Sequence, residues 1–160
     1  MKKITIPLII VLSALVDQLT KFFIVTNISL NSSVIVIKNI LSFTYIRNTG
    51  VAFGMFSNLT IVILILTILI LIILTKELKK YFDNKIMLIA YSLVVGGLLG
   101  NLIDRTIFGY VRDFIDLNFI NFPIFNVSDI LITVGIFVLL IYSFKMEVPN
   151  GNKSKERIRE

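Results

Sequence analysis

Four long apolar runs constrain this chain more than any other feature of its sequence. They cover roughly residues 4–24, 59–78, 86–103 and 127–144. At about 1.5 Å per residue, each run forms a helix that can cross a hydrocarbon core of roughly 30 Å, given tilt or help from flanking residues. Because 56% of the 160 residues are hydrophobic and only 16% are charged, the apolar surface is too large for a soluble domain. The sequence therefore predicts an all-α membrane protein, built as a four-transmembrane-helix bundle.

The first run begins like a secretory signal peptide, because Lys2 and Lys3 precede it. It is too long for the apolar part of a signal peptide, and it carries Asp17 and Lys21 where a cleavage site needs small residues. We therefore expect it to remain in the protein as the first membrane span.

The basic residues indicate how the spans are oriented. If the spans alternate, most Lys and Arg residues fall on one side of the membrane, together with both termini. They are grouped in Lys2–Lys3, Lys76–Lys85 and Lys145–Arg159. The positive-inside rule then places both termini in the cytoplasm and the loops 25–58 and 104–126 on the outer side. We expect 1–148 to form one membrane domain and 149–160 a polar cytoplasmic tail.

The first outer loop contains a stretch with strong β propensity. Ser33–Arg47 is rich in Val, Ile, Phe and Tyr and is interrupted at Lys38–Asn39, which is typical of a hairpin. The following Asn48–Gly54 contains two glycines and predicts a turn. We expect a small periplasmic β-sheet on the membrane surface.

The absence of Cys and His limits the chemistry that the chain can perform. With neither residue type in the sequence, disulfides, thiol nucleophiles, Cys/His zinc sites and Ser-His-Asp triads are excluded. Asp, Glu, Lys, Ser, Thr and Tyr remain as candidates, and we expect neither a metal nor a cofactor. The net charge of +6 follows from the cytoplasmic Lys and Arg clusters, so no nucleic-acid partner is expected.

Half of the acidic side chains lie at or near the outer ends of spans or in the second outer loop. Of the ten Asp and Glu residues, these five are Asp17, Asp104, Asp113, Asp116 and Asp129. A carboxylate at a membrane boundary is costly unless it is paired, wetted or protonated, so such residues are candidates for function. Their position on one side of the membrane predicts a shared polar site.

Two of these acids have neighbours that favour a structural role. Asp17 and Lys21 are four residues apart on the first span, with the acid first, which is the favourable order for a helical ion pair. Asp104 and Arg105 end the third span, where we expect an interfacial charge pair or an orienting role for a ligand.

The roles of the other three acids remain open from the residues alone. Asp129 begins the fourth span three residues after Asn126, a good N-cap, so helix capping and catalysis are equally compatible with it. Asp113 and Asp116 lie in the second outer loop, where an exposed acid is the common case.

Small residues mark one face of the third span. Gly96 and Gly100 form a Gly-x-x-x-Gly motif, with Gly97 beside them. Small residues at this spacing let two membrane helices approach closely, so we expect a neighbouring helix to pack on this face.

Four sequence blocks together resemble the lipoprotein signal peptidases (signal peptidase II). Each block is weakly specific, but all four occur in order on a four-span chain, and the resemblance covers nearly the whole chain. The blocks are Asp17–Lys21 (DQLTK), Arg47–Gly54 (RNTGVAFG), Gly96–Asp116 (GGLLGNLIDRTIFGYVRDFID) and Phe122–Asp129 (FPIFNVSD).

The resemblance implies a role for each candidate residue. The two catalytic aspartates of the family fall on Asp113 and Asp129. The residues implied to bind the substrate or support this pair are Asn48, Gly50, Asn101, Arg105 and Asn126. Those implied to be mainly structural are Asp17, Lys21 and Asp104. Two positions depart from the family's pattern: Ser128 stands where Ala is usual, and Arg112 is larger than the usual hydrophobic residue.

The resemblance also implies a reaction and a location. Proteins of this family are aspartic endopeptidases that remove signal peptides from diacylglyceryl-modified prolipoproteins by cleaving just before the lipidated Cys. The implied partners are these prolipoproteins, membrane lipid and inhibitory lipopeptide antibiotics such as globomycin. The implied location is a bacterial inner membrane, with the active site at its outer, periplasmic face.

Three other interpretations are compatible with parts of the sequence. A small ion- or proton-coupled transporter would also carry intramembrane acids, although the chain has no repeated halves. A peptidase with a Ser/Lys dyad would need Lys21 as its base, although Asp17 is expected to hold this ammonium charged. A structural membrane protein would explain the Asp17–Lys21 pair, but not four ordered blocks.

Overall fold

The computed structural model of the chain describes residues 2–50, 59–78 and 84–147. In chain order its elements are α1 (Lys2–Asn27), β1 (Ser33–Ile37), β2 (Leu41–Asn48), α2 (Thr60–Leu78), α3 (Lys85–Phe108), β3 (Val111–Leu117) and α4 (Val127–Glu147). All four helices are long and apolar enough to cross a membrane, which confirms the predicted set of four such helices with a small sheet. The expected tail 149–160 and residues 51–54 of the second sequence block lie outside the described residues.

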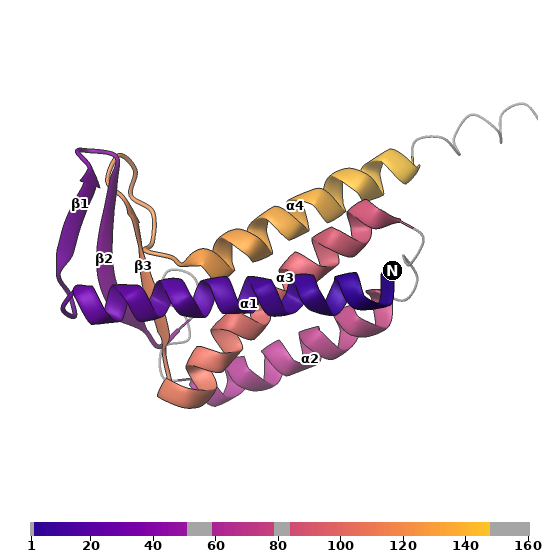
Figure 1. Cartoon of the computed structure of the whole chain (residues 1–160), viewed down its shortest axis with the longest axis horizontal. Helices are drawn as coiled ribbons and strands as arrows, with labels where there is room; N and C mark the ends of the chain where they lie inside the picture. Colours follow the sequence, from indigo (N-terminus) through magenta and orange to yellow (C-terminus); the bar gives the residue numbers. More distant parts are fainter. Residues whose placement is uncertain (1, 51–58, 79–83, 148–160) are drawn as a thin grey trace, which may run out of the picture.

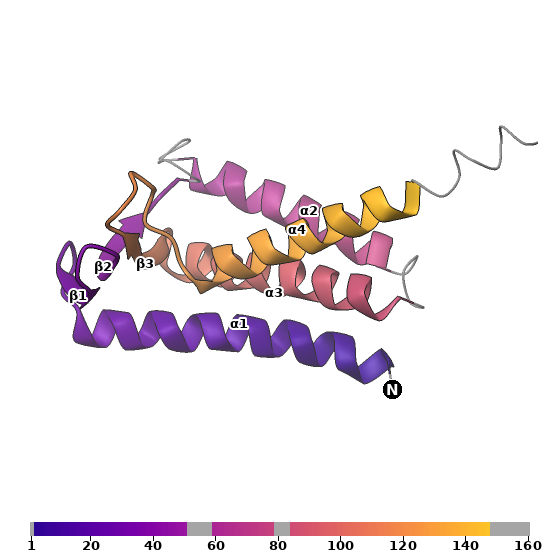
Figure 2. The same cartoon turned by 90° about the horizontal axis from the view of Figure 1, so that it is seen from above.

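α3 is the central helix of the bundle. It packs against α1, α2 and α4, and Figure 2 shows α1 and α2 on opposite sides of it. A Cβ atom at Gly96 would lie 2.5 Å from the Ser13 Cβ on α1, and one at Gly97 would lie 2.6 Å from the Ser128 carbonyl oxygen on α4. The close approach predicted for the glycine motif is therefore confirmed, and α3 uses it toward two helices.

The helices present apolar side chains on their outward faces. Large exposed hydrophobic residues include Leu12 and Phe22 on α1, Ile61 and Ile73 on α2, and Phe137 on α4. Lipid is the solvent that suits such a surface, because it requires no hydration of the apolar groups.

A three-stranded antiparallel sheet of order β1-β2-β3 lies across one end of the bundle (Figure 1). The predicted hairpin corresponds to β1 and β2. β3, in contrast, lies where only a loop was expected, and it pairs with β2 from Asn48↔Val111 onward. Asp113 and Asp116 are therefore strand residues. The sequence does not predict this strand, because its partner is remote in the chain and no local pattern indicates the pairing.

A buried apolar cluster holds the sheet on the bundle. It contains Ile24 from α1, Ile28 directly after this helix, Tyr45 from β2 and Phe114 from β3. The rings of Phe43 and Phe114 meet edge to face, with centroids 5.9 Å apart. Because Phe114 directly follows Asp113 in the chain, this packing holds the strand next to that acid.

Gly109 lets the chain reverse from α3 into β3. Its φ of +78° is left-handed, and its N–H donates to the Arg105 carbonyl at 3.1 Å. Glycine is favoured at this position because it has no Cβ to clash. The tight reversal brings the first residues of β3 back against the last turns of α3.

Candidate active site

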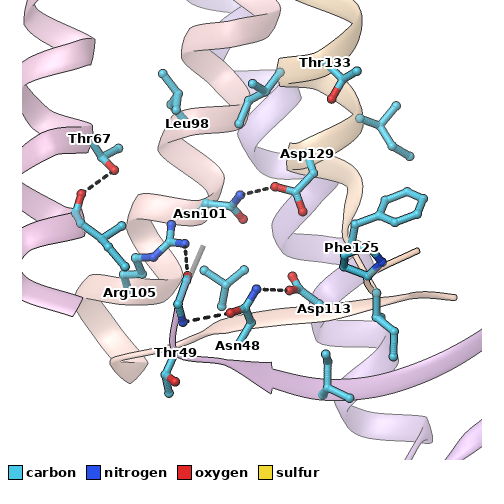
Figure 3. A pocket seen from close by; sticks show the side chains of 18 of the residues that line it. Asn48, Thr49, Thr67, Leu98, Asn101, Arg105, Asp113, Phe125, Asp129 and Thr133 are labelled. Carbon is cyan, nitrogen blue, oxygen red and sulfur yellow. Dashed lines mark hydrogen bonds between the residues drawn. The ribbon is translucent and has the colours of Figure 1, made fainter. Parts of the chain in front are cut away.

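Asp113 and Asp129 face one cavity from different elements (Figure 3). Asp113 lies on β3 and Asp129 in the first turn of α4. The chain between them folds back on itself, because backbone hydrogen bonds of 2.7 and 3.1 Å join Ile115 and Phe125 in both directions. The structure thus brings together the two acids that the resemblance assigns to catalysis.

Asn126 connects the two acids. Its Nδ2 donates to the Asp113 Oδ1 at 2.6 Å, and its backbone N donates to the Asp129 Oδ2 at 3.1 Å. In return, the backbone N of Asp129 donates to the Asn126 Oδ1 at 3.1 Å. This reciprocal pattern is a capping box at the start of α4. Asp129 therefore caps the helix and also faces the cavity, so the two roles left open by the sequence are compatible.

Asn48 holds the second oxygen of Asp113. Its Nδ2 donates to the Asp113 Oδ2 at 2.8 Å, while its Oδ1 accepts from the Gly50 backbone N at 2.9 Å. Because the amide oxygen faces a backbone donor, the NH₂ group must point at the acid. The Gly50 carbonyl accepts from the Arg105 Nη2 at 3.0 Å, which ties α3 to the segment after β2.

Asn101 holds the second oxygen of Asp129 in a similar way. Its Nδ2 donates to the Asp129 Oδ1 at 2.8 Å. Its own Oδ1 accepts from the Lys21 Nζ at 2.9 Å and from the Asn126 Nδ2 at 3.1 Å. Two donors on the oxygen fix the orientation of this amide, so its NH₂ group is also directed at the acid.

The cavity has a volume of about 1360 Å³ and combines a polar site with aliphatic walls. Besides the two acids, its polar lining includes the predicted binding residues Asn48, Gly50, Asn101 and Arg105. Aliphatic lining residues include Val62, Leu66 and Ile70 from α2, and Ile130 and Val134 from α4. Asn126, the fifth predicted binding residue, is fully buried and braces both acids rather than forming a wall.

Burial raises the pKa of Asp113 from 3.8 to about 7, and the charge of Asp129 acts in the same direction. Hydrogen bonds from Asn48 and Asn126 and the charge of Lys21 oppose the shift. The Asp113 carboxyl therefore keeps its proton well above the pH at which an ordinary aspartic acid loses it. Two neighbouring carboxyls that share a proton near neutral pH are suited to acid–base catalysis.

The raised pKa of Asp113 predicts that the fold loses stability as the pH rises from about 4 to about 7. The folded protein keeps the proton up to about pH 7, whereas the unfolded chain releases it near the ordinary value of 3.8. The unfolded state therefore binds fewer protons in this window, and the loss is on the order of 4 kcal/mol. Asp113→Asn should reduce this slope and be more stable than the wild type at about pH 8. Thermal unfolding in detergent across this pH range measures both, and an unchanged slope would contradict the raised pKa.

A buried cluster of charged residues lies behind the acids. The Lys21 Nζ lies 2.8 Å from the Asp17 Oδ2 and 3.3 Å from the Asp104 Oδ2, and all three side chains are fully buried. Asp17 also accepts from the backbone N of Ser128 at 2.9 Å, at the start of α4. The cluster joins α1, α3 and α4, and its members are not among the residues that line the cavity. The three residues predicted to be structural thus contact one another and do not line the cavity.

Two further polar residues, which the sequence does not reveal as partners, complete this cluster. The Arg112 Nη2 donates to the Asp104 Oδ1 at 2.6 Å and to the Gln18 Oε1 at 2.7 Å. The sequence marks Arg112 only as an unusually large neighbour of Asp113. Adjacent residues of a strand point to opposite faces, so a strand here would have predicted that Arg112 points away from Asp113. The sequence does not predict β3, however.

Asp116 lies outside the site. Its Oδ2 accepts from the Thr44 Oγ1 at 2.8 Å across the β2–β3 pair, and it is not among the residues that line the cavity. The solvated loop acid expected from the sequence is thus a strand residue bonded to the neighbouring strand. Within the described ranges, no group of three or more acidic side chains is placed to hold a metal ion.

Ser128 places a hydroxyl in a tight space next to the site. The residue is 0% exposed, and among the described residues its Oγ has no hydrogen-bond partner. A Cβ atom at Gly100 would clash with this Oγ and with the Asp17 Oδ2, so the glycine is required for the close packing of α3 against α1 and α4.

Ser128→Ala is expected to leave the stability unchanged or raise it by up to about 1 kcal/mol, because it removes a buried hydroxyl that has no partner. The matched control is Ser92→Ala. Its hydroxyl is equally buried but donates to the Leu88 carbonyl at 2.7 Å, so its removal should cost up to about 1 kcal/mol. Thermal unfolding of both variants decides the point. A Ser128→Ala protein less stable than Ser92→Ala would show that the Ser128 hydroxyl is satisfied.

Comparisons with known proteins point to one family. Residues 9–145 match the family model described as signal peptidase (SPase) II. A lipoprotein signal peptidase of Streptococcus agalactiae is 43% identical over 153 residues, which cover 95% of this chain and 99% of the relative. The lipoprotein signal peptidase of Lactococcus lactis is 42% identical over 141 residues, covering 88% and 94% of the two chains.

The fold has the same relatives as the sequence. A bacterial membrane enzyme solved by the in meso method superposes with a TM-score of 0.80 at 39% identity, covering 88% of each chain. A second bacterial membrane enzyme solved by the same method gives a TM-score of 0.76 at 38% identity, covering 88% of this chain and 93% of the other. On the match of sequence and fold over most of its length, the chain belongs to the signal peptidase II family of membrane peptidases.

Proposed function

We propose that this protein is an aspartic endopeptidase that removes signal peptides from diacylglyceryl-modified prolipoproteins, cleaving just before the lipidated Cys. The observation that carries the proposal is the convergence of Asp113 and Asp129 on one cavity, with Asn126 bonded to both. Membership of the signal peptidase II family and the relatives named lipoprotein signal peptidases support the substrate class.

Two carboxyls that share one proton can hydrolyse an amide without a metal or a His base. The ionised carboxylate takes a proton from a water molecule, whose oxygen attacks the scissile carbonyl carbon. The protonated carboxyl donates a hydrogen bond to the carbonyl oxygen, and a proton then passes to the leaving nitrogen. The raised pKa of Asp113 supports this sharing near neutral pH, although the titration belongs to the pair and not to one residue.

The three asparagines keep the two carboxylates in place for this step. Asn48 and Asn126 each hold one oxygen of Asp113, while Asn101 and the Asn126 backbone each hold one oxygen of Asp129. Because the orientation of these amides is set by other donors, the carboxylates are positioned before a substrate arrives.

The shape and lining of the cavity suit a lipidated peptide. The aliphatic walls from α2 and α4 would receive acyl chains and the apolar part of a signal peptide. Arg105 and Gly50 lie in the polar lining near the acids, where they would contact the peptide backbone on either side of the scissile bond.

The distribution of charge along the chain supports a location in a bacterial inner membrane, with both termini in the cytoplasm and the active site at the outer, periplasmic face. In this orientation the sheet lies on the outer surface next to the cavity. The scissile bond would then lie at the depth of the lipid interface, while the acyl chains remain in hydrocarbon.

The surroundings of Lys21 argue against a Ser/Lys dyad. Its Nζ has three acceptors, two of them carboxylates, and an ammonium held in this way has no lone pair with which to take a proton. No contact of the described residues specifically favours a transporter.

Cleavage of a synthetic peptide with a diacylglyceryl-Cys by the purified full-length protein tests the proposal. We expect a single cut just before that Cys, detected by mass spectrometry, and much slower cleavage of the same peptide without lipid. Globomycin should block the reaction. Absence of cleavage by a folded protein, or equal cleavage of the unlipidated peptide, would contradict the proposed substrate.

A further inference from the structure

Arg112 is a buried arginine directly next to Asp113, and it points away from the cavity. Only 7% of the residue is exposed. Asp113 lines the cavity, whereas Arg112 contacts Gln18 on α1 and Asp104 on α3. This opposition follows from the alternation of side chains along a strand.

A single carboxylate holds both the side chain and the backbone of Arg112. The Nε and Nη2 atoms donate to the two oxygens of Asp104 at 3.1 and 2.6 Å, which is a bidentate pair. The backbone N of Arg112 donates to the Asp104 Oδ2 at 3.0 Å. The guanidinium also lies 4.7 Å from the centre of the Phe108 ring. β3 is thus attached to the last turns of α3 at the residue before Asp113.

This attachment adds a tertiary constraint to the strand pairing that places Asp113. The register of the β2–β3 ladder shifts between Phe43↔Ile115 and Ile46↔Asp113, and beyond the shift the ladder continues through Ile46↔Asp113, Arg47↔Arg112 and Asn48↔Val111. Asp113 thus lies in a short end of the ladder next to an irregularity, where a slip of one residue would turn it away from the cavity. The contacts of Arg112 lie in this short end and hold it against α3.

Arg112 also balances the charge of the buried cluster. The cluster contains two carboxylates and two cations, which are Asp17, Asp104, Lys21 and Arg112. Their formal charges sum to zero. Without Arg112, one uncompensated negative charge would remain behind Asp113 and Asp129.

We propose that Arg112 is a positioning residue for peptide cleavage: it pins Asp113 to α3 through Asp104 and keeps the cluster behind the two acids neutral. This inference rests on the proposed function. Arg112 itself does not contact the substrate and acts on the reaction only through Asp113.

The charge balance gives the inference a signature in the pH dependence. Among the described residues, the charged groups that act on Asp113 or line the same cavity come from four elements. They are Lys21 on α1, Arg105 on α3, Asp129 on α4 and Arg47 on β2. Removing the Arg112 charge should raise the pKa of Asp113 further. The fall of activity on the alkaline side of the pH profile, here called the alkaline limb, should then move to higher pH.

Three variants of the full-length protein separate position from charge. In Arg112→Gln the charge and the bidentate pair are lost. We expect kcat to fall by about 10- to 100-fold with little change in KM. The alkaline limb should move to higher pH by roughly half a pH unit. In Arg112→Lys the charge stays and only the fork geometry is lost. In this variant the alkaline limb should stay at the wild-type pH, and kcat should fall less than in Arg112→Gln. Lys38→Gln removes one cation from the exposed turn between β1 and β2 and should match the wild type in kcat, KM and the pH of the alkaline limb.

Thermal unfolding between about pH 4 and pH 8 gives a readout that does not depend on cleavage. The pH at the midpoint of the stability loss assigned to Asp113 should be higher in Arg112→Gln than in the wild type, and unchanged in Arg112→Lys. If the wild type shows no cleavage, the proposed function fails, while this shift still tests the link between Arg112 and Asp113. If Arg112→Gln does not fold, the double variant Arg112→Met with Asp104→Asn removes both charges together, and it should show a wild-type midpoint with a reduced kcat.

Wild-type kcat and a wild-type limb in Arg112→Gln would overturn the inference. So would equal losses of activity and stability in Arg112→Gln and Arg112→Lys without a shift of the limb, because a residue that only supports the fold would give that result.

Discussion

Asp113→Asn and Asp129→Asn should each lower kcat for cleavage of a diacylglyceryl peptide by at least about a thousandfold, with the fold retained. Asn has nearly the same shape as Asp and can still accept one hydrogen bond from the neighbouring amides. It cannot take a proton from water or share one with the other acid, so the chemical step loses its acid–base pair. Because Asn keeps nearly the same side-chain shape and the aliphatic walls are untouched, KM should stay within a few-fold of the wild type.

Asp116→Asn is the matched control for these two variants. It changes an acid on the same strand as Asp113, but one that bonds to Thr44 and is not among the residues that line the cavity. Its activity should be close to that of the wild type. Single-turnover assays with purified protein measure the effect, and thermal unfolding verifies that each variant is folded. Substantial activity in a folded Asp113→Asn or Asp129→Asn protein would rule out the two-aspartate mechanism.

Lys21→Met should destabilise the protein by about 3–5 kcal/mol, the largest loss that we expect from one substitution in the polar interior. Lys21 touches Asp17 and Asp104 and donates to Asn101. Without it, two carboxylates stay fully buried with one cation, Arg112, which pairs with Asp104. A buried charge that loses its partner pays a desolvation penalty that no new contact offsets.

Lys76→Met serves as the comparison, since Lys76 lies in the last turn of α2 and is exposed. That change should cost less than about 1 kcal/mol. Denaturant or thermal unfolding in detergent measures both variants. Combining Lys21→Met with Asp17→Asn should recover part of the loss, because one of the unpaired charges is removed. A Lys21→Met protein as stable as Lys76→Met would mean that the buried cluster contributes nothing to the fold.

The sequence by itself was sufficient to predict the four helices, because a membrane span is a local property. Each depends on a contiguous run of apolar side chains and on the length of the hydrocarbon core. The glycines of α3 predicted close helix packing in the same local way, because the sequence shows directly where side chains are absent. The family resemblance carried by the ordered motifs implied Asp113 and Asp129 as the candidate acids.

Only the tertiary structure decided how these acids are held. β3 forms by pairing with β2, a strand remote from it in the chain, and Arg112 joins the start of β3 to Asp104 on α3. The orientation of each asparagine amide depends on a donor from another element, as with Lys21 on Asn101. Such hydrogen bonds join residues that are far apart in the chain, and their geometry exists only once the helices have packed. Local pattern therefore determines which segments enter the membrane, while long-range packing determines where each proton and each charge can lie.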